Sequence, residues 1–388
     1  MSAYLFCCRS AGELEAVRQE VEQERYGEVY RLQSNLEREK RGYRCKDCGK
    51  FYPFLSICHQ GKVLDPKDLS KPIGRRLKFK KASDVFCGDH YYATNKKTLL
   101  RFDIGADGNA HQTEEIPMMG GVYQVDVSPD ERYIATETFG GTIAVIDSQT
   151  KETVAKKRSC KLNGAFRFDG GNRLLYYMDR SIRCWDFLEE REHVLWQVPE
   201  GWAYREGVEH SYAVTCSTVL RPDRERLVFQ IHGAVNRAVV LKNLEVQGVY
   251  PLADSWVLSR LAHAPGLDQY ALADLERVYV YDSEFRLTDI FEYPVLRIHQ
   301  DGGGAFPVTY FEKNSMHHAY LSPDGKWVLL DCFNNILLME RQSGKVRYCV
   351  YSETGGVSCF MGFLDETHIW YNWGNSTYIM ELPGQENI

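Results

Sequence analysis

One short pattern recurs along this chain: a hydrophobic run, a turn of the Ser-Pro-Asp type, and a second hydrophobic run. The clearest copies have the turns Ser128-Pro129-Asp130 and Ser322-Pro323-Asp324-Gly325. A repeat constrains the fold more than a single motif does, because every copy must form the same supersecondary unit. The pattern carries no catalytic chemistry, so it informs the fold more than the function.

Seven copies of the turn align. They centre on Gly88-Asp89, Pro129-Asp130, Asp169-Gly170, Pro222-Asp223, Pro265-Gly266, Pro323-Asp324 and Leu364-Asp365. Successive turns are 41, 40, 53, 43, 58 and 41 residues apart. Four of these intervals are close to the roughly 40–45 residues of a four-stranded propeller blade. The two longer intervals indicate inserted loops.

Each repeat contains four short runs that read as strands. In the third repeat these are residues 164–168, 173–177, 181–186 and 193–198, rich in aromatic and β-branched side chains. An apolar residue followed by an acid ends the third run of most repeats. The pairs are Phe102-Asp103, Ile146-Asp147, Trp185-Asp186, Tyr281-Asp282 and Met339-Glu340.

With these motifs the chain resembles the WD40-like β-propellers built from Ser-Pro-Asp-Gly repeats, over roughly residues 78–388. The Gly-His dipeptide of typical WD40 repeats is absent, so we do not expect the side-chain hydrogen-bond network of that family. We predict an all-β fold, with a seven-bladed β-propeller of four-stranded blades over residues 76–388. Residues 1–75 are predicted to form a small helical and Cys-containing extension.

The seventh repeat is one strand short, because only residues 357–363, 368–373 and 377–382 have strand patterns before the chain ends. An unpaired blade edge is a liability that propellers avoid. We therefore predict that a segment from before residue 83 supplies the missing strand. The candidates are residues 76–80 and residues 3–7.

The N-terminal extension does not repeat. Leu14, Val17 and Val21 have helical spacing, which Val29, Leu32 and Leu36 resume after Gly27. These positions predict two short amphipathic helices or one kinked helix. Such helices would pack on the propeller or on each other, or would bind a partner.

A Cys-x-x-Cys turn follows the predicted helices. Cys45 and Cys48 have the spacing of a zinc knuckle, and Cys58 and His59 are further candidate ligands. Because Cys58 and His59 are adjacent, it is hard for both side chains to bind the same ion. Cys7, Cys8 or Cys87 could instead complete the four ligands. Three interpretations of this segment remain open: a structural zinc site, reduced thiols in a structural loop, and a redox-active pair.

Composition limits the classes of function. The net charge of −6 argues against a nucleic-acid binder, although Lys71, Arg75, Arg76, Lys78, Lys80 and Lys81 form a basic group. No apolar stretch reaches the roughly 18–20 residues that span a bilayer. The first residues do not predict a secretory leader, and we expect the twelve cysteines to suit a reducing compartment. Single cysteines within strand-like runs, such as Cys184 and Cys216, are interpreted as small buried hydrophobes. We expect a cytoplasmic protein.

The two long intervals contain the candidate binding loops. Both would connect the outer strand of one blade to the inner strand of the next, on the face where loops of a propeller bind ligands. Residues 199–210 and 293–318 are rich in aromatic side chains and Arg, which dominate protein interfaces. The predicted partner-binding residues are Trp202, Tyr204, Arg205, Arg297, His299, Phe306 and Tyr310.

No sequence motif of a nucleotide-binding loop, a nucleophile elbow or a zinc protease is present. We therefore expect a non-enzymatic interaction scaffold that binds a protein or peptide partner. The alternative is a propeller enzyme, a lactonase-like hydrolase or lyase with a metal or a His/Asp pair at the channel mouth. Its candidates are His299, Asp301 and His318. Since His317 and His318 open a strand, at most one of them would face the channel.

Overall fold

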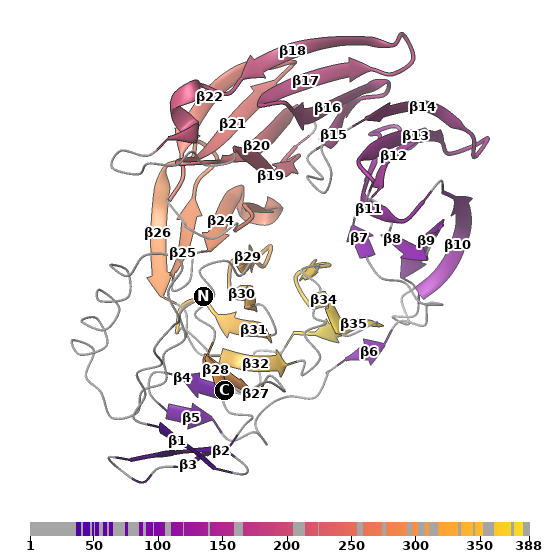
Figure 1. Ribbon diagram of the computed structural model, residues 1–388. Coiled ribbons are helices and arrows are strands. Elements are labelled where there is room, and N and C mark those ends of the chain that lie inside the picture. Colours follow the sequence, from indigo (N-terminus) through magenta and orange to yellow (C-terminus); the bar gives the residue numbers. More distant parts are fainter. Residues whose placement is uncertain are drawn as a thin grey trace. The chain divides into compact units, whose positions relative to one another are not determined.

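β-Strands make up nearly all of the regular structure in this computed structural model (Figure 1). It describes residues 36–39, 42–46, 49, 51–53, 57–59, 62–64, 74–76, 85–87, 91–95, 97–104, 110–118, 120–138, 140–158, 166–204, 214–223, 225–253, 259–273, 277–292, 297–301, 307–309, 317–332, 335–343, 346–351, 361–373 and 376–382. Within these ranges the helices are two short 3₁₀ helices, η2 (Glu200–Ala203) and η3 (Pro265–Leu267). Among the described helices none is long and apolar enough to cross a lipid bilayer.

The chain forms two units. The larger consists of Pro72–Phe291 and Met316–Ile388, and the smaller of Met1–Lys71 and Glu292–Ser315. The segment 292–315 thus groups with the N-terminal part of the chain. The predicted division into domains 1–75 and 76–388 stays a prediction.

Seven four-stranded antiparallel sheets, the blades of the propeller, form the larger unit. The first four contain consecutive strands. These are β7 (Val85–Cys87), β8 (Tyr91–Asn95), β9 (Thr98–Ile104) and β10 (Ala110–Pro117); β11 (Val122–Val127), β12 (Tyr133–Thr138), β13 (Thr142–Asp147) and β14 (Thr153–Arg158); β15 (Phe166–Gly170), β16 (Arg173–Met178), β17 (Ser181–Asp186) and β18 (Arg191–Gln197); and β19 (Thr215–Leu220), β20 (Arg226–His232), β21 (Asn236–Lys242) and β22 (Glu245–Pro251).

The last three blades follow the same order, and the seventh is completed from the N-terminal side. They comprise β23 (Ala262–Ala264), β24 (Gln269–Ala273), β25 (Arg277–Tyr281) and β26 (Leu287–Glu292); β29 (His317–Leu321), β30 (Trp327–Cys332), β31 (Asn335–Glu340) and β32 (Val346–Tyr351); and β33 (Met361–Phe363), β34 (His368–Trp373), β35 (Ser376–Glu381) and β6 (Arg75–Arg76). The predicted all-β, seven-bladed propeller of four-stranded blades is confirmed.

Six of the seven predicted turns fall between the first and second strands of a blade, and the remaining one, Asp169-Gly170, forms the end of the first strand β15. The Ser-Pro-Asp turns show why this sequence recurs. The buried Ser322 hydroxyl donates to Asp324 Oδ1 (2.6 Å) and accepts the Trp327 N–H (2.9 Å). Ser128 makes the equivalent bonds to Asp130 and Tyr133 at the same two distances. One hydroxyl thus satisfies the first backbone donor of the second strand.

The acid that ends the third strand closes the next hairpin. Asp147 Oδ1 accepts the N–H groups of Gln149 (2.9 Å) and Thr150 (3.0 Å). Asp282 Oδ1 likewise accepts the N–H groups of Glu284 (3.0 Å) and Arg286 (2.8 Å). The repeated apolar-acid pair therefore sets the turn between the third and fourth strands, because its carboxylate organises the loop backbone.

Buried apolar clusters lie between neighbouring blades and show that the blades form a ring. One cluster joins the second and third blades through Tyr133 and Phe187, and another joins the third and fourth through Cys184 and Phe229. Similar clusters join the first and second, the fourth and fifth, and the sixth and seventh blades. Strands β23 and β24 contact β29, which links the fifth blade to the sixth. A cluster of the first and seventh blades closes the ring.

The N-terminal strand β6 completes the seventh blade by pairing with β35. Arg75 lies opposite Ile379 and Arg76 opposite Tyr378. The preceding Gly74 has φ +101°, and a Cβ there would lie 2.1 Å from the Ile379 carbonyl oxygen. The predicted closure by a segment from before residue 83 is confirmed. The strand overlaps the candidate 76–80 at Arg76, while residues 3–7 lie outside the described residues.

The smaller unit also consists of β-sheet where it is described. One sheet has the order β1 (Leu36–Glu39), β2 (Gly42–Cys45) and β3 (Phe51–Pro53). The other has the order β28 (Pro307–Thr309), β27 (Arg297–Asp301), β4 (Ile57–His59) and β5 (Lys62–Leu64). The prediction of a helix ending at Leu36 is wrong at that residue, because Leu36 pairs with Cys45 across β1 and β2. The other predicted helical positions lie outside the described residues.

Candidate functional site

The first insertion connects β18 to β19 as predicted, and η2 gives its start a fixed shape. The Trp202 carbonyl accepts the Ala234 N–H (2.8 Å), and the Trp202 ring lies 5.4 Å from the Trp196 ring. A Cβ at Gly233 would lie 2.4 Å from the Trp202 carbonyl oxygen, so only glycine permits this approach. Tyr204 follows with 63% of its surface exposed. The insertion therefore presents an exposed aromatic ring from an anchored backbone.

The second insertion connects β26 to β29, as predicted, and contains two strands where we expected a loop. Strand β27 pairs with β28 and with β4 of the N-terminal segment, which places Arg297 opposite Cys58 and His299 opposite Thr309. Asp301 ends β27, opposite Pro307. The structure locates the backbone of these strands. Arg205, Phe306 and Tyr310 lie outside the described residues, so these partner-binding residues stay predictions.

His318, a candidate for the alternative enzyme, opens β29 beside His317. Its side chain is buried, with 1% of its surface exposed, and Nδ1 lies 3.5 Å from the Tyr320 hydroxyl. His299 and Asp301 belong to the smaller unit and His318 to the larger. The convergence of these three side chains that the enzyme requires stays a prediction.

The candidate zinc ligands lie in the smaller unit. Cys45 ends β2, Cys58 and His59 lie in β4, and Cys48 is outside the described residues. Within the described part of the chain, His, Cys, Asp and Glu form no group that could hold a metal ion. The structural zinc stays a prediction. Elemental analysis of protein purified without added metal should find about one zinc per chain if it is right.

A cluster of charged residues lies on, or directly after, the first strands of three blades, and the first strands line the channel of a propeller. Asp126 of β11 contacts arginines from two other blades. Its Oδ1 lies 3.3 Å from Nη2 of Arg221 and 3.9 Å from Nε of Arg167. Its Oδ2 accepts the Phe168 N–H at 2.7 Å. We call Asp126, Arg167 and Arg221 the channel cluster.

The channel cluster is held in place by the blades. Arg167 lies on β15, and its Nη1 donates to the Phe166 carbonyl (3.1 Å). Arg221 follows β19 of the fourth blade and reaches the second, where Nη2 also donates to the Val127 carbonyl (3.3 Å). Backbone acceptors thus fix both guanidinium groups. Three blades contribute to one site.

The electrostatics of the channel cluster are positive. Burial lowers the pKa of Arg167, the nearby Asp126 carboxylate opposes this, and the positive charges of Arg221 and Arg260 lower the pKa further. Asp169 also lies within electrostatic range of Arg221, but it pairs with Arg173 at 2.8 Å. Among the described residues, Asp126 is therefore the carboxylate that lies within 4 Å of both arginines of the cluster.

The channel cluster was not predicted from the sequence, although the sequence contains a signal for it. Asp126 and Arg167 each stand between two hydrophobic residues in the first strand of a repeat, and Arg221 follows Leu220. A charged residue in a run with buried neighbours must face a channel or a partner, because alternate side chains of a strand point to opposite faces.

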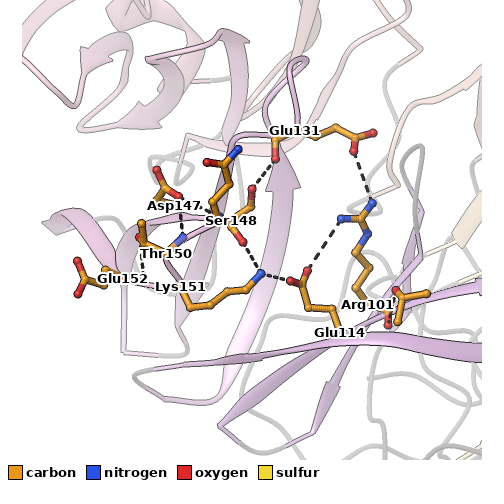
Figure 2. Close-up of polar contacts among 10 residues, drawn as sticks. Arg101, Glu114, Glu131, Asp147, Ser148, Thr150, Lys151 and Glu152 are labelled. Atoms are coloured by element: carbon orange, nitrogen blue, oxygen red, sulfur yellow. Dashed lines mark hydrogen bonds and ion pairs between the residues drawn. The ribbon is translucent and has the colours of Figure 1, made fainter.

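A second group of charges joins the first two blades, and we call it the peripheral network (Figure 2). Arg101 of β9 lies 3.9 Å from Glu114 of β10 and 3.5 Å from Glu131 of the Ser-Pro-Asp turn. The Lys151 ammonium bonds both Glu114 and the Ser148 carbonyl (Figure 2). The Ser148 hydroxyl donates to the Glu131 carbonyl at 2.8 Å. These contacts hold two blades together. The network contains two positive charges, of Arg101 and Lys151, and two negative charges, of Glu114 and Glu131.

Comparison with known proteins supports the fold and leaves the function open. No protein-family model and no curated protein sequence matches the chain. Among solved structures, the chain is similar to the β-propeller domain of Cps50 (Swd1) from Myceliophteria thermophila. The TM-score is 0.54 at 12% identity, and the match covers 80% of this chain and 100% of that domain. The class of protein is thus the seven-bladed β-propeller. At this identity the similarity establishes the fold alone.

Proposed function

We propose that this protein is a non-enzymatic interaction scaffold that binds a protein or peptide partner through the insertions between its blades. The exposed Tyr204 on the anchored η2 segment is the observation that carries the proposal. Aromatic rings on rigid backbone contribute much to interfaces, since they lose little conformational entropy on binding. The resemblance to WD40-like repeats supports the same function by analogy of fold.

The test is quantitative capture of a partner with the full-length chain. Tyr204→Ala should lose a partner that the wild-type protein captures, while Leu188→Ala should retain it. Leu188 is a matched control because it is also exposed, at 52%, and lies in the turn after β17 rather than in an insertion. Equal capture by both variants would refute a binding role for the first insertion.

We also propose a reducing, cytoplasmic environment. Cys184 and Cys216 are buried free thiols, and burial raises the pKa of Cys184 to about 11. Buried thiols with a raised pKa are chemically inert. This agrees with the interpretation of Cys184 and Cys216 as small buried hydrophobic residues. Fractionation of cells that express the tagged protein tests the compartment.

A further inference from the structure

The channel cluster carries more positive than negative charge. Arg167 and Arg221 provide two positive charges and Asp126 one negative charge. Side-chain exposures are only 24%, 24% and 11% for the three residues of the cluster. Like charges at such partly buried positions repel strongly, because solvent screens them less than at the surface.

Asp126 does not fully engage either arginine. Its contacts to Arg221 and Arg167, at 3.3 and 3.9 Å, are longer than the roughly 2.7–2.9 Å of a good charge-assisted hydrogen bond. One of its oxygens accepts the Phe168 N–H instead. The carboxylate therefore positions the two guanidinium groups and leaves donors for another anion.

The two arginines keep some contact with solvent, since each side chain is 24% exposed. Among the described residues, Nη2 of Arg167 and Nε and Nη1 of Arg221 have no hydrogen-bond partner. An arginine presents five N–H donors in a rigid fork that matches the oxygens of a phosphate. Two forks from different blades suit a tetrahedral anion, whose several oxygens can accept from both.

The cluster is separate from the proposed partner-binding face. The first insertion enters β19 at Thr215, whereas Arg221 follows the last residue of the same strand, Leu220. Six residues of strand span roughly 20 Å. An anion at the cluster would thus lie near the end of the channel where the Ser-Pro-Asp turns are found, away from Tyr204.

We propose that the channel cluster is a binding site for a phosphate group, held between Arg167 and Arg221 and oriented by Asp126. The phosphate belongs to a small phosphorylated molecule or to a phosphorylated side chain, and both present the same oxyanion to the two guanidinium groups. The site does not depend on the scaffold function, because its residues are distinct from those of the insertion.

The proposal is tested by calorimetric titration of the full-length protein with inorganic pyrophosphate in chloride buffer at fixed ionic strength. We expect saturable binding, weakened about tenfold or more in Arg167→Gln and in Arg221→Gln, since each removes a charged donor. Arg191→Gln is the control, because Arg191 is 75% exposed and pairs with Glu189 outside the channel. The control should bind as the wild type does.

A variant with the opposite expected effect guards against misfolding of the arginine variants. Asp126→Asn keeps an acceptor for the Phe168 N–H and removes the competing charge, so pyrophosphate should bind several-fold more tightly. Circular dichroism of each variant in chloride establishes folding. Absence of binding by the wild-type protein, or equal affinity of Arg221→Gln, Arg191→Gln and wild type, would overturn the proposal. Weaker binding by folded Asp126→Asn would also overturn it.

The source of the phosphate is distinguished by a second titration. A short peptide with one phosphoserine is compared with its unphosphorylated form and with pyrophosphate. Binding of the phosphopeptide at least tenfold tighter than that of pyrophosphate identifies a phosphorylated protein segment as the ligand class. Similar or weaker binding identifies a small phosphorylated molecule.

Discussion

The channel cluster and the peripheral network both combine arginine with carboxylates, yet they differ in charge balance. The cations have similar side-chain exposure, 25% for Arg101 and 28% for Lys151 against 24% for Arg167 and Arg221, whereas the carboxylates differ, 26% for Glu114 and 41% for Glu131 against 11% for Asp126. The network pairs its positive charges with as many carboxylates and fastens two blades. The channel cluster leaves an excess of positive charge. Charge balance is therefore one property that separates this structural group from the candidate binding site.

The largest expected effect on stability comes from removing the single carboxylate of the channel cluster. Asp126→Ala should lower the free energy of unfolding by about 3 kcal/mol, because two partly buried guanidinium groups lose their counter-charge. Urea unfolding followed by tryptophan fluorescence measures this. If Asp126→Ala loses no more unfolding free energy than Glu114→Ala, the channel cluster and the peripheral network do not differ in the way proposed.

Comparing serine variants of the two Ser-Pro-Asp turns tests whether the peripheral network contributes to the stability of its blade. Ser128→Ala and Ser322→Ala each remove two hydrogen bonds and leave a backbone N–H without its acceptor. Each should lower the free energy of unfolding by about 1.5 kcal/mol. Only the first turn contains a residue of the network, Glu131. A greater loss in Ser128→Ala than in Ser322→Ala, by urea unfolding, would show that the network depends on its turn. Equal losses would show that it does not.

The peripheral network itself should contribute less. Lys151→Ala removes the ammonium that bonds Glu114 and the Ser148 carbonyl, and should cost about 0.5–1 kcal/mol. The loss should shrink in 1 M NaCl, since salt screens partly exposed pairs. A loss that is unchanged by salt would indicate packing of the lysine stem as its cause.

The smallest effect concerns acid stability near the network. Backbone N–H groups of Thr150 and Gln149 lower the pKa of Asp147 below its ordinary value near 3.8, against the opposing effect of burial, with a further contribution from Arg132. A lowered folded-state pKa stabilises the protein above pH 3.8, and this contribution is lost as the pH falls through the folded-state value. Asp147→Asn should therefore flatten the pH dependence of unfolding between pH 4 and 2. An unchanged pH profile would contradict this assignment.

Much of the fold could be predicted because its signals are local. Each turn, such as Ser322-Pro323-Asp324, and each acid that ends a third strand lies within a few residues of the groups it bonds. The need for a closing strand followed from counting strands. The sheet that β27 forms with β4 could not be predicted, because about 240 residues separate the paired segments and short strands carry no partner-specific pattern.

The candidate site divides in the same way. The first insertion was found from sequence, because a long interval between two turns marks a loop regardless of the rest of the chain. The channel cluster was not found, because Asp126, Arg167 and Arg221 belong to three different repeats. Only the ring of blades brings their side chains within 3.3–3.9 Å.

The amino-acid sequence alone thus determined the number of blades, the position of their turns and the place of the insertions, since these depend on bonds between near neighbours in the chain. The tertiary structure alone decided which charges meet. Electrostatic interaction depends on distance in space, and closure of the ring places arginines from the third and fourth blades around one carboxylate of the second.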